Sequence, residues 1–299
     1  DAIGLQNTSS ADNLITDSGA AGTALATGVK TKNGYIGIDP SGKSLRSIME
    51  VAKSLGKSIG IVSTSAITHA TPASFYAEEP DRNSYENIAY DFISSGMDVA
   101  IGGGRDNFSK RSDNRNLLDS LVRRNYTVYN SLAELNNVSV SGKVVCFTAS
   151  MHNPYRLDGR GNMLPDATKK AIELLKKNEK GFVLMVEGSE IDWAGHSNSA
   201  DILIDETLDF DNAAGVAINF TRADKSTLLI VTADHETGGV TIVDGDATTH
   251  TVTLDFSTKH HTAIMVPVYA FGKKAEIFDD VYENIVIYDK MVEVINPGN

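Results

Sequence analysis

Two short, apolar, β-branched runs in this chain are each followed directly by acidic and histidine side chains. The run at 182–186 precedes Glu187, and the run at 228–231 precedes the group 232–236. Runs of this kind are typical of buried parallel strands. In an open α/β sheet, ligand sites form beyond the carboxyl ends of the strands. This feature therefore favours a parallel sheet with a chemical site at one edge.

The side chains that follow these runs are of types that bind metal ions. Asp192 and His196 lie four residues apart and share one face if their segment is helical. Asp234 and His235 follow the second run, and His261 belongs to a third group. A single Asp-His pair after a strand is often only a helix cap beside a surface ring. Three separate groups favour a metal centre, in which mixed Asp/His ligands suit zinc and an oxygen-rich position suits magnesium.

A candidate nucleophile, Ser18, lies near the start of the chain. The small residues that follow it at 19–22 allow a helix to begin close to this serine. Backbone N–H groups and the positive end of the helix dipole would then face an incoming anion. A plain N-cap is the alternative, because Asp and Ser commonly begin helices. Beside a metal centre, Ser18 is a candidate for a metal-activated serine that forms an alkoxide near neutral pH.

The motifs around these residues resemble those of the alkaline phosphatase family, in particular its small bacterial members. They occur in the family's order and at plausible spacings. The motifs are Asp17-Ser18-Gly19, Thr27-Gly28-Val29-Lys30, Thr68-His69-Ala70-Thr71-Pro72-Ala73, Val186-Glu187-Gly188, Asp192 with His196, Val231-Thr232-Ala233-Asp234-His235, and His261-Thr262. The resemblance implies that Ser18 is the nucleophile and becomes a phosphoserine.

The resemblance also implies a centre of two zinc ions and one magnesium ion. One zinc, which activates the attacking water, would be held by Asp192, His196 and His261. The second zinc, against which Ser18 is deprotonated, would be held by Asp234 and His235. Two such metals, about 4 Å apart, clamp both ends of an in-line displacement. The magnesium would be bound by Thr71 and Glu187.

Three further residues have expected places near these metals. His69 stands where some family members have Asp, which places it beside the magnesium as a ligand or as a neighbour of a ligand. Arg82 matches the arginine that grips two phosphate oxygens, a task that suits its planar fork; the alternative is a surface arginine. Trp193, between zinc ligands in the sequence, either lines the phosphate pocket or packs against a neighbouring helix.

One departure from the family's pattern concerns the start of the chain. Family members carry an aspartate at the end of an apolar sheet strand, some tens of residues before the serine, and its carboxylate bridges the second zinc and the magnesium. Before Ser18 the chain has Asp1, Asp12 and Asp17, and neither Asp1 nor Asp12 follows an apolar run. We find no such strand and expect the chain to be a fragment that lacks it. Loss of a central strand would expose two rows of unpaired backbone groups and an apolar face.

Strand-like and helix-like segments alternate along the chain. Strands are predicted at 58–62, 98–101, 127–129, 144–147, 181–186 and 227–231, and helices at 45–55, 85–94, 117–124, 166–177, 202–221 and 281–294. This alternation predicts an α/β fold with a doubly wound, mostly parallel sheet and helices on both faces. One domain, residues 1–299, is sufficient, and residues 240–257 form a small hairpin insertion.

Composition limits the partners. The formal net charge is −12 and no basic stripe offsets it, which argues against a nucleic-acid partner. No apolar stretch approaches the ~20 residues of a membrane span. The resemblance, rather than the sequence, implies a homodimer in the periplasm or outside the cell; the chain shows no signal peptide.

The expected function is a phosphomonoesterase, a hydrolase of phosphate monoesters with broad specificity, because no segment indicates a pocket for one leaving group. Two alternatives stay open. One is a phosphodiesterase of the same superfamily, against which Arg82 argues, because a clamp on two free oxygens favours a dianionic monoester. The other is a non-catalytic metal- or phosphate-binding remnant, supported only by the missing aspartate.

Overall fold

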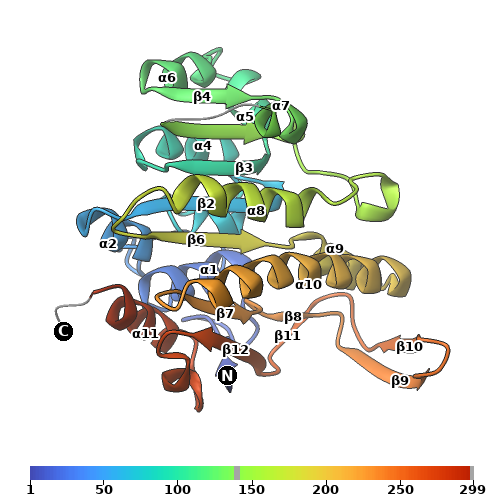
Figure 1. Ribbon diagram of the computed structural model, residues 1–299. Helices are drawn as coiled ribbons and strands as arrows, with labels where there is room; N and C mark the ends of the chain where they lie inside the picture. The colour runs from blue at the N-terminus through green and yellow to red at the C-terminus, as the bar shows by residue number, and fades with distance from the viewer. Residues whose placement is uncertain (138–141, 297–299) are drawn as a thin grey trace.

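The computed structural model describes residues 1–137 and 142–296, and its strands form two main sheets (Figure 1). Neighbouring strands of the five-stranded sheet are all parallel, and the order is β4 (Tyr126–Tyr129), β5 (Lys143–Phe147), β3 (Val99–Gly103), β2 (Ser58–Ala66) and β6 (Phe182–Glu187). The expected α/β fold with a mostly parallel sheet is confirmed.

The second sheet has four strands, in the order β13 (Val281–Glu283), β1 (Ala2–Asn7), β12 (Val266–Gly272) and β7 (Leu228–Thr232). Strand β12 is antiparallel to both β1 and β7. The sequence analysis did not identify β1, because its alternating buried and exposed positions include Gly4 and Gln6 and so do not form an apolar run. The helix predicted at 281–294 is wrong in its first turn: residues 281–283 pair with β1, and α11 (Val286–Ile295) begins after them.

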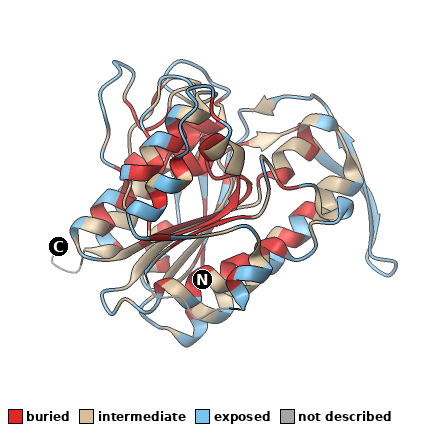
Figure 2. Ribbon diagram, turned by 90° about the horizontal axis from the view of Figure 1, so that it is seen from above, coloured by how far each residue is buried: buried red, intermediate tan, exposed pale blue. Residues whose placement is uncertain are grey.

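Helices cover both faces of the five-stranded sheet because successive strand residues point to opposite sides. Ile61 of β2 packs in a core cluster with residues of α2 (Ile48–Ser54), α4 (Tyr85–Ser94) and α6 (Leu117–Arg123). The next residue, Val62, packs in a second cluster with residues of α7 (Leu132–Asn136), α8 (Met163–Leu175) and α10 (Ala200–Ala223). The buried stripes on these helices face the strands (Figure 2).

The expected hairpin insertion is present. Strands β9 (Val240–Asp246) and β10 (Thr251–Phe256) pair antiparallel, extend from the body of the fold and are mostly exposed (Figure 1). Within the two described ranges, no helix combines the length and the apolar character that crossing a bilayer requires.

A buried ionic cluster fastens the connection between β5 and α8 to helix α10. Arg160 of this connection lies 2.5 Å from Glu206 Oε2 and 2.8 Å from Asp209 Oδ2, and all three side chains are almost completely buried. Because burial removes these charges from water, each charge would destabilise the fold without the opposite charge beside it. The cluster therefore fixes the segment that also carries His152, described below.

We predict that Arg160→Ala lowers the free energy of unfolding by about 3–5 kcal/mol. Glu206 would lose its buried counter-charge, and Asp209 would keep only Arg156, whose Nε lies 3.8 Å from Asp209 Oδ1. Urea unfolding followed by circular dichroism measures the change. Arg115→Ala is the matched control, since the Arg115 side chain is 66% exposed, and it should change stability by less than about 0.5 kcal/mol. Equal effects of the two substitutions would show that the buried cluster contributes little.

Candidate metal centre

The carboxyl ends of β6 and β7 bring the three acid-and-histidine groups together. Strand β6 ends at Glu187 and leads into α9 (Glu190–Ser197), which carries Asp192 and His196. Strand β7 leads to Asp234 and His235. The third group, His261, lies on β11 (His261–Thr262), which pairs with β8 (Glu236–Thr237) directly after His235. Gly195 permits the contact of α9 with β8, because a Cβ there would lie 2.8 Å from the Thr237 carbonyl oxygen.

Asp192 lies at the centre of the histidines. One ligand atom each from Asp192, His235 and His261 lies within 4.8 Å of the others. Asp192 Oδ1 is 3.4 Å from the Nε2 atoms of both His196 and His261, and these two Nε2 atoms are 3.2 Å apart. The ring of His235 stacks on that of His261 at 3.5 Å between centroids. The predicted ligands of the first zinc are thus neighbours in space.

Backbone carbonyl groups set the tautomers of two of these histidines. His196 Nδ1 is 2.7 Å from the Lys259 carbonyl oxygen, and His261 Nδ1 is 2.7 Å from the Thr16 carbonyl oxygen. A carbonyl oxygen only accepts, so each Nδ1 carries the hydrogen and the neutral ring keeps a lone pair on Nε2. Two lone pairs and a carboxylate converge, a donor set that fits zinc.

The same contacts shift the acidities of the ligands. Burial opposes ionisation of Asp192, but its hydrogen bonds with His196 and His261 hold the pKa of this carboxyl well below its usual range. The hydrogen bond to Asp192 raises the pKa of His196 to about 8. Burial disfavours the charged form of His261, yet its bonds to Asp192 and the Thr16 carbonyl raise its pKa. In the metal-free protein, protons therefore compete with a cation for these rings.

Ser18 lies beside the predicted ligands of the second zinc. It is the first residue of α1 (Ser18–Thr27), and its Oγ is 3.1 Å from His235 Nε2. Asp234 Oδ2 lies 3.3 Å from the same nitrogen. The helix cap is Asp17, whose Oδ1 accepts from the Ala20 N–H at 2.9 Å. Because Asp17 caps the helix, the Ser18 hydroxyl is free of that task.

Glu187 and Thr71 form an oxygen-lined position, at the place where the family resemblance implies magnesium. The Ser63 hydroxyl donates to Glu187 Oε2 at 2.6 Å, and Ser65 donates to the same atom at 3.4 Å. Thr71, on α3 (Ala70–Ala73), adds a side-chain hydrogen bond. Burial raises the pKa of Glu187 despite these bonds. A buried carboxyl group surrounded by hydroxyls fits an oxygen-preferring cation.

His69, the N-cap residue of the helix that carries Thr71, contacts Trp193 and a residue that the sequence analysis missed. The ring of Trp193 lies edge-on to His69 at 5.7 Å and to His152 at 4.7 Å. Burial lowers the pKa of His69 to about 3, and its Nδ1 finds no hydrogen-bond partner among the described residues. His152 Nδ1 accepts from the Ala66 N–H at 3.1 Å. Its position after β5 is the signal that could have found it, because sites collect polar residues beyond strand ends.

Arg82 is not an isolated surface arginine. Its Nη1 donates to Asp17 Oδ2 at 2.9 Å, and its side chain is only 21% exposed. Burial disfavours the charged form of Asp17, but hydrogen bonds from the Ala20 N–H and from Arg82 keep its pKa below the usual value. The guanidinium is thereby bound to the residue that directly precedes Ser18. The sequence analysis did not identify Asp17 as the partner of Arg82.

Comparison with known proteins gives consistent matches. A family model described as alkaline phosphatase matches residues 1–255. Alkaline phosphatase 4 of Bacillus subtilis is 37% identical over 292 residues, which are 95% of this chain and 63% of that protein. Another curated relative, alkaline phosphatase 3 of the same organism, is covered over 50% of its length. The chain thus spans about half to two thirds of the length of these relatives.

Solved structures agree with these matches. The alkaline phosphatase of the Antarctic bacterium TAB5 superposes with a TM-score of 0.94 at 40% identity, covering 99% of this chain and 88% of that one. A mutant of the same enzyme has Mg bound in its M3 site. The alkaline phosphatase of Thermus thermophilus gives a TM-score of 0.90 at 25% identity, covering 98% of this chain and 82% of that one.

We predict that zinc affinity rises with pH up to about 8 and then levels off. The raised pKa of His196, about 8, means that its ring stays protonated below that pH, and a protonated ring does not bind a metal. Zinc must displace this proton from the His196 ring, which lowers the zinc affinity about tenfold for each pH unit below the pKa. Competition with a chromophoric chelator between pH 6 and 9.5 measures the effect.

A control variant is His250→Asn, in the exposed turn of the hairpin, which should keep the same profile. An affinity that is constant from pH 6 to 9 would contradict the assignment of His196 as a ligand.

Proposed function

Because the chain belongs to the alkaline phosphatase family, we propose that it hydrolyses phosphate monoesters through Ser18 at a centre of two zinc ions and one magnesium ion. The observation that carries the proposal is the position of Ser18. Its hydroxyl lies at the start of α1 and 3.1 Å from His235, where a helix N-terminus and metal-ligating residues meet.

The residues of the chain provide places for all three cations. One zinc would be held by Asp192, His196 and His261, the other by Asp234 and His235, and the magnesium by Glu187 and Thr71. His69 would lie beside the magnesium. When bound, such cations stabilise an alkoxide at the serine and the negative charge on a leaving oxygen.

The side chains themselves bind and orient the substrate. The N–H groups at the start of α1 and the positive end of its dipole face a phosphate that approaches Ser18. Arg82, held by Asp17, offers its remaining N–H groups to two phosphate oxygens. Ser18 Oγ would lose its proton and form a bond to phosphorus while the bond from phosphorus to the ester oxygen breaks and that oxygen takes up a proton. Water would then attack phosphorus, which releases phosphate and restores the Ser18 hydroxyl. Trp193, whose ring lies 5.7 Å from that of His69, would line this pocket and limit the access of water.

A monoesterase is favoured over a phosphodiesterase by the place of Arg82. A guanidinium fixed beside the nucleophile matches two free, negatively charged oxygens, whereas a diester has only one negative charge to share. Turnover of an aryl phosphate monoester beside the matching diester tests this choice. A binding remnant without catalysis would turn over neither substrate.

We extend the proposal to specificity and location. Broad specificity for small phosphate monoesters, export to the periplasm or secretion, and a homodimeric state are all proposals from the family. The matches to alkaline phosphatases of Bacillus subtilis and Escherichia coli support the location, whereas the specificity and the homodimeric state rest on the family resemblance alone.

We predict that Ser18→Ala lowers kcat for an aryl monoester by about 10³-fold or more, because the nucleophile is removed. Labelled phosphate trapped at low pH should disappear, while bound zinc, measured by atomic absorption, should stay unchanged. Ser41→Ala, in an exposed turn, is the control and should keep both. Continued incorporation of phosphate in the Ser18 variant would show that another residue is the nucleophile.

We predict that Arg82→Ala lowers kcat/KM for the monoester by about 10- to 100-fold, the scale of one charge-assisted, two-pronged contact. Any residual diester activity should fall much less, since a diester uses the clamp less. Arg82→Lys keeps the charge without the fork and should recover only part of the loss. Equal losses with both substrates would argue that Arg82 only stabilises the fold.

A further inference from the structure

The carboxyl-terminal part of β2 carries three successive residues with hydroxyl side chains. They are Ser63, Thr64 and Ser65, and all three are completely buried. The four residues before them, 59–62, have no polar side chain. A buried hydroxyl group destabilises a fold unless it is hydrogen-bonded. None of the three takes part in the proposed reaction, so their hydrogen-bond partners indicate what they do.

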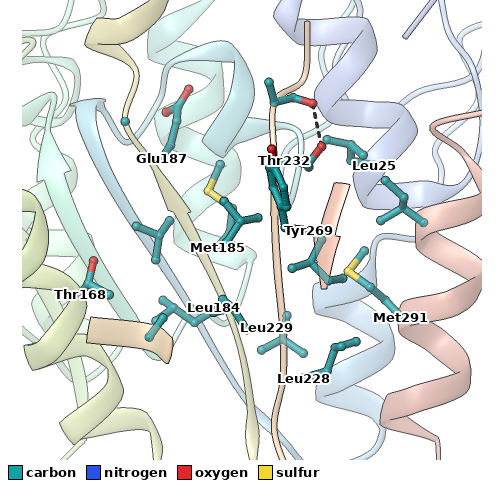
Figure 3. Close-up of a pocket in the computed structure, with 18 of the residues that line it drawn as sticks. Leu25, Thr168, Leu184, Met185, Glu187, Leu228, Leu229, Thr232, Tyr269 and Met291 are labelled. Atoms are coloured by element: carbon teal, nitrogen blue, oxygen red, sulfur yellow. Dashed lines mark hydrogen bonds between the residues drawn. The ribbon is translucent and has the colours of Figure 1, made fainter. Parts of the chain in front are cut away.

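The two serines share one partner, the carboxyl group of Glu187. Parallel pairing of β2 with β6 places Ser63 beside Glu187, and Ser65 points to the same side because residues two apart in a strand share a face. Ser63 Oγ lies 2.6 Å from Glu187 Oε2, and Ser65 Oγ lies 3.4 Å from the same atom. Figure 3 shows this carboxyl group at the end of β6, beyond the apolar side chains of Leu184 and Met185. Both serines thus contact one oxygen of a proposed magnesium ligand.

A third serine, Ser189, completes the arrangement. Its Oγ lies 2.9 Å from Ser63 Oγ, and its N–H donates to the Thr64 hydroxyl at 2.9 Å. Ser65 Oγ lies 2.8 Å from Ser63 Oγ. An ionised carboxylate only accepts, and a hydroxyl group has one hydrogen to donate. Because Ser63 gives its hydrogen to Glu187, hydrogen bonds from Ser65 Oγ and Ser189 Oγ run toward Ser63, and each bond polarises the next.

The occupied oxygen limits how a cation can bind Glu187. Calcium takes about 6–8 oxygen ligands and often binds both oxygens of one carboxylate, whereas magnesium requires a nearly ideal octahedron at shorter distances. A carboxylate whose Oε2 is held by Ser63 has one oxygen left to offer to a cation.

We propose that Ser63 holds Glu187 with one carboxylate oxygen toward the cation, and that this arrangement selects magnesium over calcium. Ser65 and Ser189 act behind it by orienting the Ser63 hydroxyl. All three are positioning residues. The proposal rests on the proposed function, because it takes the magnesium to lie at Glu187 and Thr71.

The test compares the binding of magnesium and of calcium to the 299-residue chain loaded with two equivalents of zinc. Equilibrium dialysis followed by elemental analysis gives the affinity for each cation. Glu187→Gln defines the background, because a carboxamide does not replace the carboxylate ligand. Only the binding that is lost in this variant is assigned to the site, and in the wild-type chain it should favour magnesium.

Ser63→Ala should lower the ratio of magnesium to calcium affinity by about tenfold or more, the scale of one hydrogen bond to a charged group. The freed Oε2 lets calcium bind through both oxygens, while magnesium loses the oriented carboxylate. Ser65→Ala removes a longer contact and should lower the ratio less. Thr221→Val is the matched control: it removes a buried hydroxyl that donates to the Ala217 carbonyl within α10, and it should leave the ratio unchanged.

Three outcomes would overturn the proposal. One is an unchanged ratio in Ser63→Ala. Another is an equal loss of affinity for both cations, which would mean that the serines only support the fold. The third is a wild-type chain without preference for magnesium. Circular dichroism checks the folding of each variant; if Ser63→Ala does not fold, Ser189→Ala removes a donor to Ser63, and its ratio, lowered or unchanged, decides instead.

Turnover distinguishes this proposal from the proposed function. A wild-type chain that prefers magnesium but does not hydrolyse an aryl phosphate monoester would contradict the proposed function and leave the role of Ser63 standing. A chain that hydrolyses the monoester, with the same cation ratio in the wild type and in Ser63→Ala, would contradict only the role of Ser63.

Discussion

The burial of both faces of the parallel sheet is the constraint on which the rest of this molecule depends. Successive residues of β2, such as Ile61 and Val62, enter opposite core clusters, so both faces are apolar in the middle of the sheet. The polar side chains of the candidate site therefore lie near or beyond the carboxyl ends of the strands. β2, β6 and β7 all end at the same edge, and nearly every candidate ligand follows one of these three strands. The site is thus a consequence of how the sheet is covered.

Polar contacts between residues far apart in the sequence fix the positions of the side chains at that edge. The Thr16 carbonyl, two residues before Ser18, holds the ring of His261, which lies 245 positions away in the chain. Asp17 caps α1 with one carboxylate oxygen and holds Arg82 with the other. Ser18, the proposed nucleophile, thus follows directly on the two residues that position the ring of His261 and the guanidinium of Arg82. Because these residues are consecutive, a change in one of these contacts would shift the backbone that carries the others.

The centre is also divided between the two sheets. Glu187 ends β6 of the five-stranded sheet and Asp192 follows it, whereas Asp234 and His235 follow β7 of the four-stranded sheet. The relative position of the two sheets consequently sets the distances between the ligand sets.

The sequence by itself determined the α/β fold, most helix and strand positions, and the three ligand groups, because apolar periodicity and the residues after each strand are local properties. It did not show β1 or β13, since Gly4, Gln6 and the short segment 281–283 form strands only through pairing with neighbours distant in the chain. The anchoring of Arg82 by Asp17, the tautomers set by the Thr16 and Lys259 carbonyls, and the place of His152 were decided only by the tertiary structure. Each depends on two segments that meet in space, and no local pattern records such a meeting.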